Sequence, residues 1–408
     1  IRLSLVGSEM CIRDSNSYIS LINTNVSRRS PKNDLYYTAN VTATDFMLKT
    51  KNNLYSVSAR IALSQKYYDT LDNEFGHSYN ISLGKTGGAF RAEYTLNGMS
   101  DTYDHNDMGY LRRNNEFENE LQFSYIINRP FWRINNTRNS IQFTYAQLYN
   151  PRVFTQSQIR ISSFTIFRNF SNINLMMEYT PSGLNDYFEP RVEGRYYHEG
   201  ADLQTSFSYD TNRDKKFYIG TNFSFTKIWS AYDQKSYMIS LSPGIRLNNR
   251  FSINHMFTYQ SMLNDIGYVN DYASGEIFFG KRNNKTVMNT LSAGYIFSAD
   301  SYLSFRLRHY WSQANYTNDF YLLTDNGELD NNISYSENHN SNFNSLNLDL
   351  VYNWRFAPGS DISLVWKNSI YSYGDMILKG FFDNLDYMFT SPQTNSISVK
   401  ILYYLCLL

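Results

Sequence analysis

The chain has 408 residues, with 37 basic and 37 acidic side chains and therefore no net formal charge. This neutrality argues against a nucleic-acid partner, which would favour a basic stripe. No apolar run approaches the ~18 residues of a membrane-spanning helix, which excludes that class. Aromatic residues nevertheless make up 17 % of a chain whose mean hydropathy is only −0.49. Such a composition is typical of a transmembrane β-barrel, where an apolar lipid face and a polar lumen face average out.

The two ends differ from the rest of the chain. Residues 5–15, LVGSEMCIRDS, resemble the translation of a sequencing adapter. We predict that residues 1–15 and 406–408 are non-native and that residues 16–405 form one outer-membrane β-barrel domain. Both cysteines, Cys11 and Cys406, lie in the end segments, so disulfides, thiol catalysis and Cys-ligated metals are not expected. The alternative is a genuine but unusual terminus. No signal peptide is present, but a chain truncated at its N-terminus could not show one.

Apolar and polar residues alternate along nearly the whole chain from residue 17, and this period of two predicts strands without a convincing helix. The pattern indicates about 18 to 20 strands. The early ones are expected at 17–26, 35–48, 52–65, 77–84 and 88–98. The middle ones are expected at 116–127, 139–149, 157–168, 172–180, 189–198, 202–210 and 216–226. The last ones are expected at 236–247, 251–260, 267–280, 286–298, 301–312, 342–356, 361–372 and 395–405. These strands do not keep strict parity between the two ends near 250–285, so we expect that one strand is miscounted there.

Charged residues of the last strands fall on the face opposite the apolar one. An Arg facing lipid near the bilayer midplane would cost about 2–4 kcal/mol. We therefore assign these charges to the lumen: Arg306, Arg308, Asp349, Arg355, Lys367 and Lys400. In the strand 395–405, we expect Ile397, Val399, Ile401 and Tyr403 to face lipid and Ser398 and Lys400 to face the lumen.

Tight connections at 247–250, 298–300 and 357–360 contrast with long polar ones at 99–115, 313–341 and 373–394, which is the outer-membrane pattern. Lipid offers no hydrogen bonds, so a spanning sheet is expected to close by pairing its last strand with the one near residue 17. A barrel of this size leaves a lumen, either water-filled or plugged. The 313–341 loop is long enough to fold inward, although exposure to water is the simpler interpretation.

Few side chains suggest bound metals or catalysis, and no cofactor is expected. Asp101, Asp104 and Asp107 are weak candidates for a Ca²⁺ site, because a hard cation needs several oxygen ligands close together. Their spacing is not that of an EF-hand, and a solvated loop is the simpler interpretation. A second acidic set, Asp325, Glu328 and Asp330, has the same ambiguity. The six histidines lack metal-binding spacing, and no serine lies in a Gly-x-Ser-x-Gly elbow, so no catalytic residue is assigned.

Aromatic side chains on the apolar faces of strands are expected to form the interfacial girdles of the barrel. The candidates are Trp311, Tyr352, Trp354, Trp366 and Tyr403, and His309 is expected at a similar belt position. The alternative is a surface on which sugars stack. For Tyr316, Phe320 and Tyr321, which are predicted to lie in a loop, both interpretations stay open.

Several separated runs resemble one known family. These runs are NDMGYLRRNN at 106–115, FRLRHYWS at 305–312, WRFAPGS at 354–360, LVWKN at 364–368 and SPQTNS at 391–396. Over about residues 16–405 the chain resembles the C-terminal outer-membrane β-barrel of the DUF5916 family, found mainly in Bacteroidetes. The resemblance implies a preceding family 9-type carbohydrate-binding domain, and with it a possible glycan partner. It implies no catalytic residues.

Three functions remain open at this stage. The first is a non-enzymatic barrel of the bacterial outer membrane, the membrane half of a carbohydrate-associated surface or transport protein, whose partner is the membrane lipid. The second is an outer-membrane enzyme with a site on the barrel wall or loops. The third is a soluble, secreted all-β protein. The three differ in what contacts the apolar faces of the strands and in whether polar side chains converge.

Overall fold

A computed structural model of the chain describes residues 4–11, 16–29, 36–272, 275–331 and 333–405. It divides into two compact units, residues 1–163 with 178–185 (unit 1) and residues 164–177 with 186–408 (unit 2). The strand β9 (Phe154–Phe167) and the strand β10 (Asn172–Thr180) are shared between them. No helix in the described ranges is long and apolar enough to cross a membrane.

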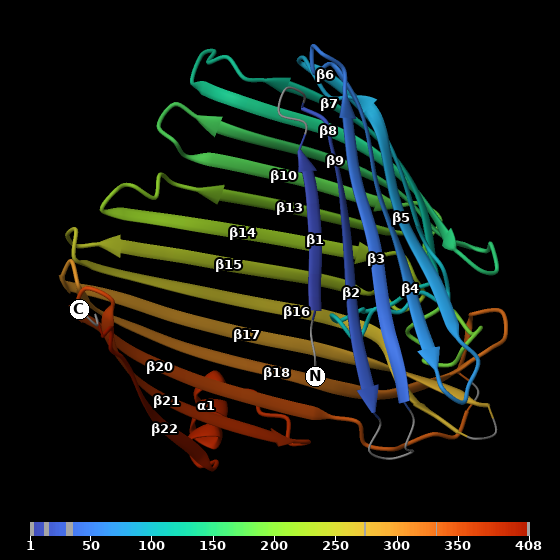
Figure 1. The fold of residues 1–408 in the computed structure, drawn as a ribbon. Helices are drawn as coiled ribbons and strands as arrows, with labels where there is room; N and C mark the ends of the chain where they lie inside the picture. The colour runs from blue at the N-terminus through green and yellow to red at the C-terminus, as the bar shows by residue number, and fades with distance from the viewer. Residues whose placement is uncertain (1–3, 12–15, 30–35, 273–274, 332, 406–408) are drawn as a thin grey trace. The chain divides into compact units, whose positions relative to one another are not determined.

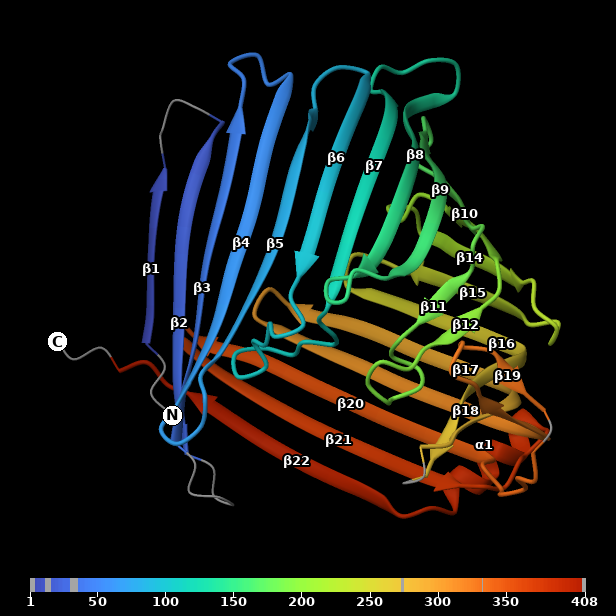
Figure 2. The same cartoon turned by 90° about the vertical axis from the view of Figure 1, so that its right-hand side faces the viewer.

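Unit 1 is a meander of antiparallel strands in which each pairs with the next along the chain (Figure 2). Besides its share of β9 and β10, it contains β1 (Ser4–Cys11), β2 (Tyr18–Arg29), β3 (Tyr36–Lys49), β4 (Tyr55–Tyr68), β5 (Glu74–Lys85), β6 (Phe90–Met99), β7 (Glu116–Ile127) and β8 (Ile134–Leu148). The short β11 (Leu184–Asp186) pairs with β9.

Unit 2 continues in the same way, and most of its strands pair with the next in sequence (Figure 1). It contains β12 (Tyr197–Glu199), β13 (Asp202–Asp210), β14 (Phe217–Ile228), β15 (Lys235–Arg246), β16 (Phe251–Asp271), β17 (Ile277–Ser298), β18 (Ser301–Leu323), β19 (Leu329–Asp330), β20 (Ser341–Ala357), β21 (Ser360–Gly374), α1 (Phe381–Phe389) and β22 (Gln393–Leu402). The short β19 folds back on β18, which also pairs with β20.

The all-β, antiparallel fold class is confirmed. The described residues form 22 strands, four of which, β1, β11, β12 and β19, have eight residues or fewer. The remaining long strands agree with the expected 18 to 20. Closure of the sheet into a barrel stays a prediction, as does the non-native origin of the chain ends, whose residues 1–3, 12–15 and 406–408 lie outside the described ranges.

Two of the predicted strands are wrong. Residues 267–280 do not form one strand, because they include the end of β16, a turn and the start of β17. The long strands β16 and β17 thus take the place of the three strands predicted between 251 and 298. With one strand fewer, the short turns and the long loops of unit 2 alternate between its two ends. Residues 189–198 are mostly irregular, because Arg191 and Gly194 have positive φ values of 59° and 75°, which interrupt an extended strand.

The strands β16, β17 and β18 are unusually long, with 21, 22 and 23 residues, whereas a tilted strand crosses a bilayer in about 9–11 residues. The first residue of β15 pairs with Leu263 and the first residue of β20 pairs with Ala314, so the far ends of the three strands extend beyond their neighbours. We call residues 264–271, 277–283 and 315–323 the projecting ribbon. Part of the predicted 313–341 loop is therefore strand.

The projecting ribbon has its own apolar core. Ile266, Ile277, Phe279, Tyr321 and Leu323 are buried against Tyr197 of the irregular segment 187–199. The guanidinium of Arg195 donates to the Leu323 carbonyl across 2.9 Å and lies 3.2 Å from a carboxylate oxygen of Asp325. The segment 187–199 is thus fastened to the ribbon by both apolar packing and hydrogen bonds.

The sequence predicts a polar loop at 373–394, but the structure forms the helix α1 within this range. Its residues Phe381, Leu385 and Met388 are spaced at i, i+4 and i+7, a helical period that could have revealed it. Met388 is fully buried against Leu346 of β20 and Ile370 of β21. The helix therefore covers one face of unit 2.

Candidate functional site

The six charges predicted to face the lumen lie on one face of unit 2. Arg306 of β18 pairs with Asp349 of β20, which in turn pairs with Lys367 of β21. Since side chains alternate along strands, Arg308, Arg355 and Lys400 share this face, for which we use the name polar face. That the polar face lines a lumen stays a prediction.

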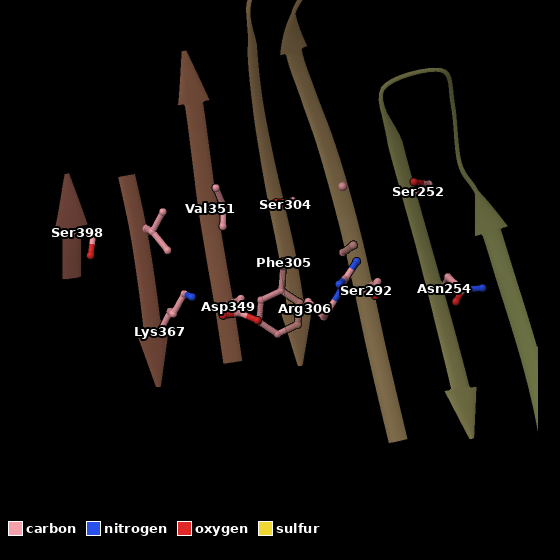
Figure 3. A pocket seen from close by; sticks show the side chains of 13 residues that line it. Ser252, Asn254, Ser292, Ser304, Phe305, Arg306, Asp349, Val351, Lys367 and Ser398 are labelled. Carbon is pink, nitrogen blue, oxygen red and sulfur yellow. The ribbon is translucent and has the colours of Figure 1, made fainter. Parts of the chain in front are cut away.

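An open groove of about 760 Å³ runs across the polar face over β16 to β22. Figure 3 shows its polar side chains coming from neighbouring strands. They are Asn254 and Ser252, Ser292, Ser304 and Arg306, Asp349, Lys367 and Ser398. Ser398 is among the residues that the sequence places on this face, whereas Ser252, Asn254 and Ser292 are not predicted, although they occupy the same alternate positions of their strands as the charges do. Small polar neighbours leave the longer charged side chains open to water.

The charges in the groove do not cancel. Asp349 forms an ion pair with Arg308, and at the short-turn end Arg355 Nε donates to Asp300 Oδ1 across 2.8 Å. Among the described residues, neither Arg306 nor Lys367 lies within ion-pair distance of a carboxylate. The groove therefore presents an excess of positive charge to any solute that contacts it.

The opposite face of the same strands is apolar over most of its length. It carries Leu348, Leu350 and Tyr352 of β20, opposite Asn368, Trp366 and Leu364 of β21. Trp366 is 39 % exposed, and Ile397 in β22 is 79 % exposed. Unit 1 shows the same division along β4, where Val57, Ile61 and Leu63 are exposed on the face opposite Arg60, Ser64 and Lys66. We call this surface the apolar face.

Several of the predicted aromatic positions need correction. Trp311 and His309 share the apolar face but are buried rather than exposed, because Phe381 of α1 packs against both rings. Tyr316, Phe320 and Tyr321 belong to β18 and not to a loop. Phe320 and Tyr321 are buried, since Phe320 packs on Tyr335 and Tyr321 on Tyr232, so these two rings offer no open surface to a sugar. Trp354, Trp366 and Tyr403 are exposed, as a girdle requires.

The acidic loop of unit 1 binds protein side chains. Lys66 Nζ lies 2.6 Å from Asp104 Oδ2, and Arg28 Nε lies 2.8 Å from Asp107 Oδ1. Asn150 Nδ2 donates to Asp101 across 2.8 Å. The three carboxylates thus have different partners, and no group of three or more metal-binding side chains occurs among the described residues. A Ca²⁺ site at these residues stays an untested prediction.

These contacts dock the loop 100–115 onto the polar face of unit 1. The Asp104 amide donates to Ser64 Oγ across 3.1 Å, and Tyr103 is buried with its backbone against Gly76, where a Cβ would lie 2.2 Å from Tyr103 Cα. Burial raises the pKa of Asp104, but the hydrogen bonds from Lys66 and from the Asn106 amide lower it by more. The pKa of Asp104 is therefore below its ordinary value. A charged Asp104 therefore holds the loop in place.

Three histidines have neighbours that fix their rings. His77 Nε2 lies 2.8 Å from Tyr149 Oη, and His255 Nε2 lies 3.2 Å from Asn289 Oδ1. His339 Nε2 lies 2.7 Å from Tyr335 Oη and 3.8 Å from Glu337 Oε2, in the segment 333–340 beside the projecting ribbon. These pairings join the histidines to phenol, amide and carboxylate groups. They do not form the Ser–His–acid arrangement of a hydrolase.

The strand register defines an antiparallel all-β protein whose sheet has one polar and one apolar face in each unit. The chain belongs to the DUF5916 family, a domain of unknown function, which matches residues 13–407. The implied family resemblance is confirmed by this match.

Comparison with curated proteins gives no significant match. Among solved structures, CdiB from Escherichia coli is 7 % identical with a TM-score of 0.34, and the match covers 98 % of this chain and 67 % of CdiB. A mutant porin from Rh. blastica is 10 % identical with a TM-score of 0.25, over 98 % of this chain and 99 % of the porin. Likeness at this level is too low to carry an argument, so the fold rests on the strand register described above.

Proposed function

We propose that the chain is a β-barrel of the bacterial outer membrane whose apolar face contacts lipid and whose polar face lines a water-filled passage. The observation that carries the proposal is the division of faces: long strands expose Val57, Ile61, Leu63, Trp366 and Ile397 on one side and place charges on the other. A soluble protein would have to bury such a surface, whereas in a bilayer its exposure is favourable.

The polar groove supports a passage that favours anions. Arg306 and Lys367 present positive charge beside small polar side chains, in an open groove of about 760 Å³. Rings or rows of charged side chains set ion preference in pores, because like charges are repelled from the wall. The proposed role is transport or surface binding, without catalysis.

The proposal includes an association of the protein with carbohydrate. It rests on the domain order that the DUF5916 resemblance implies, in which a family 9-type carbohydrate-binding domain precedes the barrel. In that arrangement the preceding domain would bind a glycan and the barrel would hold it at the membrane.

Planar-bilayer recording tests the passage. The folded protein is expected to conduct with a preference for chloride over potassium, and the double substitution Arg306→Glu with Lys367→Glu is expected to reduce or reverse that preference. Ile397→Val, on the apolar face, is the matched control and should leave selectivity unchanged. Absence of conductance from correctly folded protein would contradict the passage and favour a plugged or anchoring barrel. Partition into the aqueous phase on detergent extraction would contradict the membrane assignment itself.

A further inference from the structure

The helix α1 lies on the apolar face of unit 2, where that face changes character. Going along β20 toward its N-terminal end, the side chains on this face are Leu350, Leu348 and Leu346, and then Asn344 and Asn342. On β18 and β21 the corresponding positions beyond the change are Trp311, Gln313 and Ser372. Up to Leu346 the face is mostly apolar, and beyond Leu346 its side chains are polar except for Trp311, which is fully buried together with Asn342 and Asn344.

The contacts of α1 span this boundary. Met388 packs on Leu346 and Ile370, the last apolar residues of the face. One turn earlier, Asn384 Oδ1 accepts hydrogen bonds from Asn342 Nδ2 at 3.1 Å and Asn344 Nδ2 at 3.0 Å. The helix is thus fixed at one position along the strands, with an apolar contact at Leu346 and polar contacts at Asn342 and Asn344.

The outward side of α1 is divided into two edges. Phe382 and Phe389 are 80 % and 58 % exposed and lie two turns apart, so they form one aromatic edge. Asp383 and Asp386 are also exposed, and at about 100° per residue they lie about 100° and about 40° around the helix from Phe382, on the side away from Phe389. A helix with an aromatic edge beside a charged edge has the amphipathic division of helices that lie in a membrane interface, although the charges here are acidic and those of such helices are mostly basic.

We propose that α1 lies in the headgroup layer of the bilayer, with Phe382 and Phe389 inserted among the lipids and Asp383 and Asp386 in water. This inference rests on the membrane function proposed above. The lipid surface is the partner that the geometry favours, because the aromatic edge adjoins the apolar face at the height where that face ends. The acidic edge argues against recruitment by anionic headgroups, so a zwitterionic lipid is expected to suffice.

Fluorescence quenching of the full chain in phosphatidylcholine vesicles tests the proposal. Cys11→Ser and Cys406→Ser remove both thiols of the chain, and Phe382→Cys or Asp386→Cys then carries a bimane label. The label at 382 should be quenched by lipids with a nitroxide in the headgroup or upper acyl chain, and its quenching by aqueous iodide should be several-fold weaker than at 386. Because both positions are exposed, neither label disturbs the packing of the helix.

A third label, at Leu364→Cys on the apolar face, distinguishes the interfacial position of α1 from the proposed membrane function on which it rests. Quenching at 364 by mid-chain nitroxides together with the expected result at 382 supports both. Quenching at 364 with equal iodide access at 382 and 386 overturns the interfacial helix alone. Protection of 382 from both iodide and lipid nitroxides also overturns it, in favour of a protein contact. No lipid quenching at 364 overturns the membrane assignment and the helix proposal together.

Discussion

Trp311 Nε1 donates a hydrogen bond to Asn342 Oδ1 across 2.8 Å, and both side chains are fully buried beneath α1. A tryptophan on the apolar face of a spanning strand would ordinarily contact lipid. Here the helix covers it, and the indole N–H has a protein partner in place of an interfacial one. The pair continues through Asn384 to Asn344, so α1 and the sheet share one buried polar network.

Asn384→Leu is expected to release α1 from the sheet. The substitution leaves the buried amides of Asn342 and Asn344 without their partner, and each unsatisfied group costs about 1–3 kcal/mol. Hydrogen exchange of the amides in 381–389 should accelerate while exchange in β20 and β21 remains slow. Asp386→Asn, on the exposed edge, is the control. Unchanged exchange in the Asn384 variant would show that the network does not hold the helix.

Docking of the loop 100–115 is expected to depend on pH. Burial raises the pKa of Asp104, but the hydrogen bonds from Lys66 and from the Asn106 amide lower it more strongly. The pKa of Asp104 in the folded protein therefore lies below that in the unfolded chain. The contact therefore stabilises docking above the ordinary aspartate pKa of about 3.9 and is lost as pH falls through the lowered value. Proteolysis with an acid-active protease should show the loop becoming sensitive below about pH 4. Lys66→Met should be sensitive already at neutral pH. Equal protection of the variant and the parent at neutral pH would contradict the role of the pair.

Phe279→Ala is expected to loosen the projecting ribbon while the other strands of unit 2 stay folded. The ring is fully buried, its centroid lies 5.0 Å from that of Tyr197, and such truncations cost about 3–5 kcal/mol. Limited proteolysis should cleave the segment 187–199, whereas the heat-modifiable mobility of the folded protein on gels should persist. Ile296→Ala, at the exposed opposite end of β17, is the control. Loss of heat-modifiable mobility in Phe279→Ala would show that ribbon and sheet fold as one unit.

The sequence was informative where a strand is flanked on both sides and uninformative where tertiary contacts decide. Alternation placed β20 and β21 almost to the residue and put Arg306, Asp349 and Lys367 on one face, because a period of two fixes side-chain direction. It could not place Trp311 and His309, since their burial depends on a helix that lies 70 residues further along the chain. It also failed at 189–198, where backbone conformations with positive φ at Arg191 and Gly194 outweigh an alternating pattern.

The docked loop was a further surprise. The residues 100–115 were interpreted as a solvated polar segment, and their acidic side chains as weak cation ligands. Their partners Arg28, Ser64 and Lys66 lie 35 residues or more away in sequence, so composition could not reveal the ion pairs. The long polar segment that was considered for inward folding, 313–341, instead begins as strand.

The central claim, that the apolar face contacts lipid, is tested most directly by placing arginine at two neighbouring positions of β20. Leu350 lies on the apolar face and Val351 lines the groove on the polar face. Folding into phosphatidylcholine vesicles, measured by urea titration, should show Leu350→Arg destabilised by about 2–4 kcal/mol and Val351→Arg nearly unchanged. An equal cost at both positions, or a greater cost at Val351, would contradict the claim.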